Sequence, residues 1–228
     1  MILKSLPAVI VFLIMWSGKC LAAPITIESS FDYNTEGWGR IGDSGSSLRY
    51  SSSNGNPDGY IYIQDAARGT VDWFIAPNKF NGDLSEFLNG VFSFDIRLSS
   101  VSNPILDYSI ATIMGLDGEL QTKLKVGNII GDIRAGQWTT LQFQLTPDDW
   151  LLGGKTASLA EFTSILSSVT QIRILGDWRS GAETVSLDNV RFSGDSYAVP
   201  EPSYVGIFSF GLMGLLLFRR KSTNSVPQ

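Results

Sequence analysis

The stretch Val91-Phe92-Ser93-Phe94-Asp95-Ile96-Arg97-Leu98 decides the fold class of this chain. Large apolar side chains alternate with polar ones along it, which is the two-residue period of a β-strand with one buried face and one wet face. Trp138–Leu145 repeats the pattern, with Leu141, Phe143 and Leu145 on the apolar side. Both stretches therefore predict half-buried strands of an antiparallel sheet.

Further short apolar segments lie on either side of these two, separated by clusters of glycine, serine and asparagine. This spacing is typical of an all-β sandwich or barrel. The number of segments is sufficient for two stacked sheets. The additional strands that we expect are Ile25–Ile27, Trp38–Ile41, Leu48–Ser51, Tyr60–Gln64, Asp72–Ala76, Tyr108–Met114, Leu120–Val126, Ile172–Leu175 and Thr184–Phe192.

One segment has a helical pattern instead. Ser158 is followed three residues later by Glu161, which is the capping-box signature of a helix start. Apolar residues then recur at helical spacing, so a single short helix is expected from about Leu159 to Ser168. The residues from Gly82 to Leu88 predict one more helical turn before the strand at Val91.

The phase of the last strand slips at Asp188-Asn189. Val185 and Leu187 share one parity, whereas Val190 and Phe192 share the other. An extra residue at this point would form a β-bulge, which often redirects a side chain beside a site. The alternative is a strand that is irregular or buried on both faces.

Both ends of the chain carry targeting patterns. Lys4 precedes the apolar run Leu6–Trp16, and Cys20-Leu21-Ala22 provides small residues for signal peptidase, so residues 1–22 predict a secretory signal peptide. Near the other end, Val199-Pro200-Glu201-Pro202 precedes an uncharged run from Tyr204 to Phe218. As a helix this run would rise about 22 Å, which is short for a membrane span.

The basic cluster Arg219-Arg220-Lys221 follows the apolar run and marks the expected cytoplasmic end. This order of motif, apolar segment and basic cluster resembles the PEP-CTERM sorting signal of Gram-negative bacteria that produce exopolysaccharide. The resemblance covers residues 199–221 and leaves a tail at 222–228. It implies membrane association through the apolar helix, processing by an exosortase, and delivery to the cell envelope, the cell surface or the extracellular matrix. The alternative is an ordinary C-terminal membrane anchor.

Without these ends, residues 23–198 form one candidate domain with 12 basic and 21 acidic residues, a net charge of −9 against −5 for the whole chain. An acidic surface of this kind argues against nucleic acid as a partner. The single cysteine, Cys20, lies in the expected signal peptide, so the domain is expected to have no disulfide bond. The chain contains no histidine, which removes the commonest general base and the usual zinc ligand.

Several short motifs in the domain resemble the laminin B domain, also called laminin domain IV type A. They include Gly59-Tyr60-Ile61-Tyr62-Ile63, Trp73-Phe74-Ile75-Ala76-Pro77, Ser93-Phe94-Asp95-Ile96-Arg97 and Leu187-Asp188-Asn189-Val190. The similarity runs from about Ser29 to Ser193. It implies a jelly-roll sandwich of the galactose-binding-like type, a fold shared with many carbohydrate-binding modules, although a fold alone does not establish a function.

The resemblance also implies a structural calcium ion that joins the first and last strands, since hard oxygen ligands suit calcium. By similarity the C-terminal ligand is Asp188. From the N-terminal side the candidates are Glu28 and Asp32, together with Asn56 or Asp58 from the next loop.

A sugar site needs exposed aromatic rings beside polar groups. The candidates are Tyr60, Tyr62, Trp73, Trp150 and Trp178. Trp150 and Trp178 come first, because each stands beside aspartate in an expected loop, although packing in the core is the alternative for both. Trp38, Trp73 and Trp138 lie within strand patterns and are expected in the core.

The sequence as a whole predicts an exported interaction or adhesion domain without enzymatic activity, associated with the envelope or with extracellular polysaccharide. A carbohydrate-binding module for exopolysaccharide is the first alternative. A glycan-processing enzyme is the second, since the 21 carboxylates could supply an acid and a base. No pair of them is singled out by the sequence.

Overall fold

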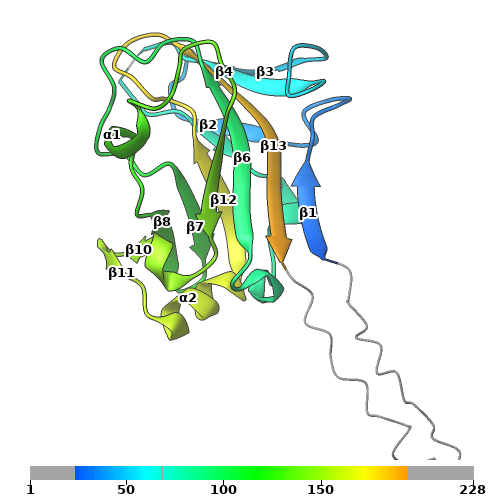
Figure 1. Cartoon of the computed structure of the whole chain (residues 1–228), viewed down its shortest axis with the longest axis vertical. Helices are drawn as coiled ribbons and strands as arrows, with labels where there is room; N and C mark the ends of the chain where they lie inside the picture. Colours follow the sequence, from blue (N-terminus) through cyan, green and yellow to red (C-terminus); the bar gives the residue numbers. More distant parts are fainter. Residues whose placement is uncertain (1–23, 68, 195–228) are drawn as a thin grey trace, which may run out of the picture. The chain divides into compact units, whose positions relative to one another are not determined.

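Two antiparallel β-sheets pack face to face in the computed structural model of this chain, which describes residues 24–67 and 69–194 (Figure 1). We name them sheet I and sheet II. Sheet I has the order β3-β4-β13-β6-β9, with β1 also paired to β13, and sheet II has the order β11-β10-β8-β7-β12-β5-β2. The described residues belong to one compact unit. The predicted sandwich of two sheets is confirmed.

The strands of sheet I are β1 (Ile25–Ser29), β3 (Ser47–Ser51), β4 (Tyr60–Gln64), β6 (Val91–Leu98), β9 (Thr139–Gln144) and β13 (Thr184–Gly194). Those of sheet II are β2 (Gly39–Ile41), β5 (Trp73–Ile75), β7 (Ala111–Gly115), β8 (Gly118–Thr122), β10 (Trp150–Leu152), β11 (Lys155–Thr156) and β12 (Val169–Leu175). The chain crosses repeatedly from one sheet to the other, which is the connectivity expected of a jelly roll. The finer galactose-binding-like assignment stays a prediction.

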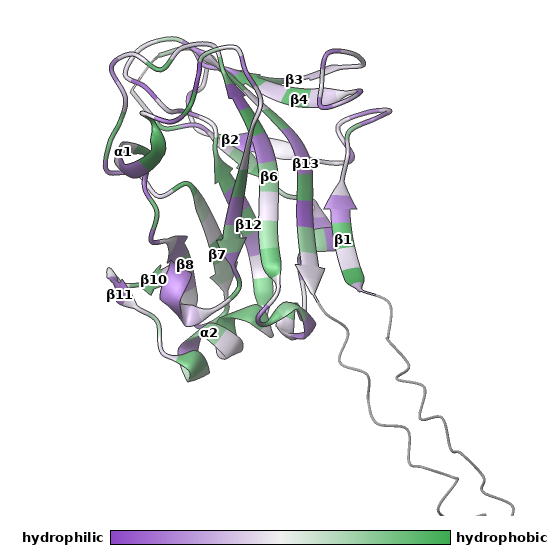
Figure 2. Cartoon of the chain, viewed as in Figure 1, coloured by the Kyte–Doolittle hydropathy of each residue, from purple (hydrophilic) through white to green (hydrophobic). Residues whose placement is uncertain are grey.

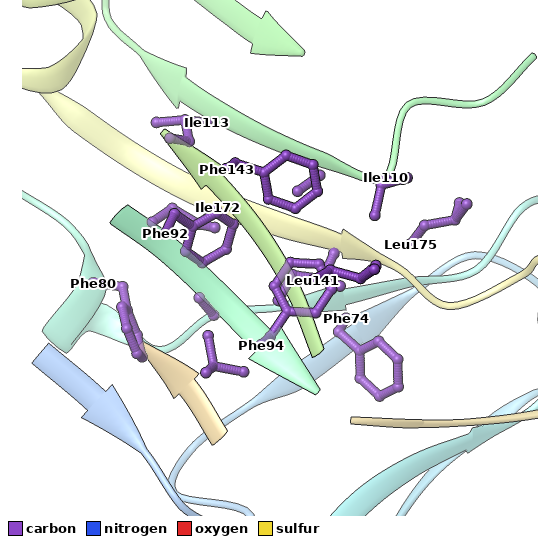
Figure 3. Packing of buried hydrophobic residues seen from close by; sticks show 14 of the residues in the cluster. Phe74, Phe80, Phe92, Phe94, Ile110, Ile113, Leu141, Phe143, Ile172 and Leu175 are labelled. Atoms are coloured by element: carbon purple, nitrogen blue, oxygen red, sulfur yellow. The ribbon is translucent and has the colours of Figure 1, made fainter. Parts of the chain in front are cut away.

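The apolar residues that alternate along Val91–Leu98 form part of the core. Phe92, Phe94, Ile96 and Leu98 are all fully buried, and apolar bands alternate with polar ones along β6 (Figure 2). Figure 3 shows the rings of β6 and β9 facing aliphatic side chains of β7 and β12 from sheet II. Burial of this kind stabilises the fold by roughly 1.5–3 kcal/mol for each large apolar side chain.

Strand β13 organises sheet I. It pairs with β6 on one side, and on the other side it pairs with β4 through Thr184–Leu187 and then with β1 through its later residues. The register to β6 shifts between Asp188 and Arg191, and Asn189 has a φ of 48°. The β-bulge predicted from the slip at Asp188-Asn189 is therefore confirmed.

Helix α2 (Leu159–Leu166) begins where the capping box predicts it. Ser158 Oγ accepts a hydrogen bond from Glu161 N, and Glu161 Oε2 accepts one from Ser158 N. The expectation of only one short helix is wrong, because α1 (Val126–Ile129) adds a turn where a strand was predicted to continue to Val126. The chain turns there because Val126 N donates to Tyr108 O and Lys125 N donates to the side chain of Asn128.

Three short 3₁₀ turns complete the regular structure: η1 (Asn78–Phe80), η2 (Ser85–Phe87) and η3 (Pro147–Asp149). The second confirms the turn expected between Gly82 and Leu88. The sequence analysis did not predict β10 and β11, a hairpin joined by Gly153 and Gly154, whose φ angles of 57° and 80° suit a two-residue turn.

The expected signal peptide and the apolar helix of the sorting signal lie outside the described residues. Among residues 24–67 and 69–194, no helix is long and apolar enough to cross a membrane.

Candidate functional site

The outer face of sheet I presents three rows of polar and aromatic side chains. Side chains that are paired across antiparallel strands lie on the same face. The pairing therefore places Tyr62, Ser186 and Arg97 in a first row and Asp188, Asp95 and Thr140 in a second. The third row contains Glu28, Arg191, Ser93 and Gln142. The bulge lies between the second and third rows, and it keeps both Asp188 and Arg191 on this face.

An aromatic hollow lies over the first row. Its volume is about 310 Å³, and its lining includes Tyr60, Tyr62, Arg97, Ser99, Thr184 and Ser186. The ring of Tyr60 is 5.6 Å from that of Tyr62 and 5.6 Å from that of Trp138, centroid to centroid. The Arg97 guanidinium lies over both Tyr60 and Trp138, with its carbon 4.6 Å and 4.5 Å from the two ring centroids. All three rings are partly exposed, so apolar ring surface and polar groups meet at one place.

A polar hollow of about 390 Å³ lies further along the same face. It is lined by residues that include Glu28, Ser93, Asp95, Thr140, Asn189 and Arg191. Asp95 is buried, and it accepts hydrogen bonds from Thr140 Oγ1 and from the side-chain amides of Asn56 and Asn189. The loop that carries Asn56 is therefore fastened across the sheet between the two hollows.

Trp150 and Trp178 do not form a sugar site, and the alternative of packing in the core holds for both. Both indoles are fully buried. Trp150 packs against Phe143 and Phe162 and donates from Nε1 to Gln144 O, and Trp178 donates from Nε1 to Leu175 O. Neither ring has a face left for a sugar. The aspartates beside them indicated a loop, but the indole rings are buried, whereas Asp148 is exposed and Asp177 is partly exposed.

Of the five residues considered for calcium, Asp188 and Asn56 are in contact. Asp188 is buried, and its two oxygens accept hydrogen bonds from Asn56 N at 2.6 Å and Asn189 N at 2.8 Å. Burial, first, and then the nearby carboxylates of Asp95 and Asp32 raise the pKa of Asp188 to about 6. Asp32 accepts from Ser30 Oγ.

The other two candidates have different surroundings. Asp58 is exposed, and the Glu28 carboxylate lies on β1, 3.9 Å from Arg191 Nε. The Glu28 carbonyl accepts a hydrogen bond from the Lys79 ammonium. Amide N–H groups, not oxygens, face both oxygens of Asp188. These contacts do not fit a cation cage at Asp188, and calcium stays an untested prediction.

Tyr60 and Tyr62 are where the sequence analysis expected them, but it missed Trp138 and Arg97. The alternation of apolar and polar residues in the sequence indicated that both side chains face outward. Trp138 has the parity of Thr140 and Gln142, which face outward, and Arg97 has that of Ser93 and Asp95. Their meeting with Tyr60 was not predictable, because it depends on the pairing of β4 with β13 and of β13 with β6. Trp38 is in the core as predicted, whereas Trp73 and Trp138 are only partly buried.

A third hollow, which we call the acidic cleft, has a volume of about 250 Å³ and is lined by residues that include Asp43, Asp65, Val71, Tyr108, Asp177 and Arg179. Burial, and then repulsion from Asp65 and Asp72, raise the pKa of Asp177 to about 7. Burial also raises the pKa of Glu183 to about 7, even though Glu183 accepts hydrogen bonds from Trp178 N and Arg179 N. Asp177 Oδ1 and Glu183 Oε2 are buried without a hydrogen-bond partner among the described residues.

Comparison with known proteins identifies the sorting signal. Residues 198–221 match the model of the PEP-CTERM protein-sorting motif, which marks the chain for export and for sorting at the cell envelope. The match contains the predicted Val199-Pro200-Glu201-Pro202 and Arg219-Arg220-Lys221. No curated protein sequence matches the chain.

Several solved structures are similar to this chain. The L4b domain of human laminin alpha-2 is 13% identical, with a TM-score of 0.44, over 54% of this chain and 70% of that one. The family 11 carbohydrate-binding module of the cellulosomal cellulase Lic26A-Cel5E of Clostridium thermocellum is 13% identical, with a TM-score of 0.48, over 76% and 96%. The CBM22-1 xylan-binding domain of Xyn10C from Paenibacillus barcinonensis is 12% identical, with a TM-score of 0.42, over 75% and 95%.

The family model that covers most of the folded unit describes laminin B, domain IV. It matches residues 73–202, from β5 through the end of β13, which is more than half of the chain. The match includes β6, β9 and the bulged β13, and therefore most of the strands behind the two hollows of sheet I. The chain belongs to the laminin B (domain IV) family.

Proposed function

We propose that this chain is an exported, non-catalytic binding protein whose folded domain holds a polysaccharide on the outer face of sheet I. The partly exposed cluster of Tyr60, Tyr62 and Trp138, set among hydroxyl groups, is the observation that carries the proposal. It supports the carbohydrate-binding alternative over a general adhesion surface.

The chemistry of the face suits a sugar chain. A pyranose ring has apolar C–H faces and polar edges, so it needs aromatic surface beside hydrogen-bonding groups. The aromatic hollow offers both, because Ser99, Thr184 and Ser186 lie beside Tyr60 and Tyr62. The polar hollow continues along β6 and β13 with Ser93, Thr140 and Asn189. The loop that carries Asn56 lies between the two hollows, so an extended sugar chain that occupies both passes over this loop.

The sorting motif agrees with such a partner. A PEP-CTERM protein is exported and sorted, so its domain works outside the cytoplasm. We infer that an exosortase-type enzyme handles the tail and that the domain works in the envelope or matrix of a Gram-negative cell. Extracellular polysaccharide is the polymer that a binding domain would meet there.

Isothermal titration calorimetry of the purified chain with a panel of neutral and acidic polysaccharides tests the proposal. We expect saturable binding to at least one polymer and a loss of about tenfold or more in affinity in Tyr60→Ala and Trp138→Ala, corresponding to about 1.4 kcal/mol or more. Trp73→Ala is the matched control, since Trp73 is a partly buried tryptophan on β5 of sheet II. Equal losses in all three variants, or no binding to any polymer, would refute the proposal.

Glycan hydrolysis in the acidic cleft is the second candidate. A general acid needs a carboxyl group whose pKa lies near the working pH, and the pKa of Asp177 is raised to about 7. The chain offers no histidine for this role. Release of reducing sugar from any polymer of the panel, abolished by Asp177→Asn, would establish this activity instead.

A further inference from the structure

The charge in the aromatic hollow indicates which kind of sugar it takes. Arg97 is the one formally charged side chain among the described residues that line it. The other two hollows differ, because the polar hollow contains Asp95 and Glu28 besides Arg191, and the acidic cleft contains three aspartates besides Arg179. In a domain with an acidic balance, the aromatic hollow therefore has a local positive charge.

The Arg97 charge has no acidic partner within the described part of the chain. No ion pair joins it to a carboxylate there, and its one hydrogen bond runs from Nη1 to Asn54 O at 2.9 Å. Asp95 lies two residues away on the same face, but its oxygens are already occupied by Thr140, Asn56 and Asn189. The guanidinium is instead held over the rings of Tyr60 and Trp138, which fixes its position without neutralising it.

Other donors lie nearby. The hydroxyl groups of Thr184 and Ser186 belong to the lining of the hollow. Ser99 Oγ accepts from Thr184 N, so its own hydrogen remains free to donate. A hollow that has hydroxyl donors, a guanidinium without a carboxylate partner and no carboxylate in its lining favours an anionic, acceptor-rich group.

We propose that the sugar unit bound in the aromatic hollow carries a carboxylate, so that the ligand is a glycan containing uronic acid. This inference rests on the proposed function and specifies its substrate class. The carboxylate lies against the free edge of the Arg97 guanidinium, and the sugar ring lies against the exposed surface of Tyr60 and Tyr62.

The test uses pairs of polymers that differ only in the carboxylate. Polygalacturonate and alginate are titrated into the full chain beside the same polymers after reduction of their carboxylates to primary alcohols. The ratio of the two affinities is the readout. We expect the native chain to favour a polyuronate by about tenfold over its reduced form, a preference that weakens as salt screens the charges.

Variants assign this preference to Arg97. In Arg97→Gln the ratio should fall towards one, whereas Arg97→Lys should keep part of it, because the charge remains and the planar donor edge is lost. Arg173→Gln is the matched control, since Arg173 lies on β12 of sheet II and bonds to Gln171. It should leave the ratio unchanged. Near-ultraviolet circular dichroism establishes that each variant is folded.

The outcomes separate the two proposals. Equal affinity for polyuronate and reduced polymer, or an unchanged ratio in Arg97→Gln, overturns the carboxylate inference and leaves polysaccharide binding standing. Failure to bind any neutral or acidic polymer overturns both.

Discussion

At the scale of single residues, the least satisfied groups are the buried carboxyls beside the acidic cleft. Asp72 is fully buried and has one oxygen without a partner among the described residues, while its other oxygen accepts from Arg40 Nη1 and Asp43 N. Burial raises the pKa of Asp72, as it raises those of Asp177 and Glu183. A buried carboxyl without full hydrogen bonding is more stable in its neutral form.

This arrangement predicts a pH dependence of stability. The folded chain retains protons on Asp177 and Glu183 up to a pH of about 7, whereas the unfolded chain releases them near a pH of about 4. The folded state therefore binds more protons in between, and the free energy of unfolding should fall as pH rises from about 5 to about 7.5. The carboxyls of Glu36 and Glu161 have lowered pKa values, so their contributions change only at more acidic pH.

Urea denaturation across this pH range measures the effect. The double variant Asp177→Asn with Glu183→Gln cannot ionise at these positions and should lose the part of the slope that these two carboxyls cause, which makes it more stable than the native chain at pH values of about 8. The part that Asp188 contributes, up to a pH of about 6, should remain. Asp132→Asn, at an exposed carboxylate, should keep the native slope. A native stability that rises through this range would show that these carboxyls are not the ones that control it.

At the same scale, the sequence predicted the chemical type of the site residues better than their exposure. Tyr60 and Tyr62 were found because aromatic side chains alternate with buried isoleucines. For Trp150 and Trp178 the neighbouring aspartates made an exposed ring a candidate, and packing in the core was the alternative that the structure confirms. A ring is buried when other rings reach it across the sandwich, and those contacts join residues distant in sequence, such as Trp150 and Phe162.

At the scale of elements, the bulge of β13 is the feature that joins the two hollows. Before the bulge β13 pairs with β4, and after the bulge it pairs with β1. Polar side chains of β13 face outward on both sides of the bulge. The side-chain amide of Asn189 bonds to Asp95 Oδ2 at 2.7 Å and also to Asn56 O. Asn189 thus helps to hold the loop that crosses the sheet, together with Asp188 and Asp95.

Replacement of Asn189 should loosen that loop. Asn189→Gly keeps the left-handed backbone but removes both amide hydrogen bonds, and it should lower the free energy of unfolding by about 2 kcal/mol. Asn189→Ala should cost about 1 kcal/mol more, because φ is 48°. Chemical denaturation checks both values.

Asn54→Gly is the control for this series. Asn54 is exposed and also left-handed, and its side chain contacts only Ser53 within the described chain. We expect no more than a small change in stability. Native stability in Asn189→Gly would mean that the amide does not fasten the loop.

Elements with a strong local signal were predictable. The alternation fixed β4 and β6, and the capping box placed the start of α2. The sequence analysis failed where tertiary hydrogen bonds end a strand, as at Val126, which donates to Tyr108 O. It also missed β10 and β11, although Gly153-Gly154 between short apolar and polar segments is a hairpin signal.

At the scale of the whole molecule, the fold separates two roles. The interior between sheets I and II is filled by aromatic and aliphatic side chains, so the described domain is held by its core, and no cysteine occurs in it. The outer face of sheet I is available for the proposed binding groups, because the alternation that fills the core also presents every second residue outward. The sorting motif then determines where that face works.

Hydrogen–deuterium exchange of the full chain, with and without a saturating polysaccharide from the panel, tests this account most directly. We predict that the ligand slows exchange in the loop from Asn54 to Gly59 and in the segment from Arg134 to Trp138, which border the two hollows of sheet I. Exchange in the acidic cleft, from Asp177 to Glu183, should not change. Slowed exchange confined to that cleft or to the strands of sheet II would contradict the assignment of binding to the outer face of sheet I.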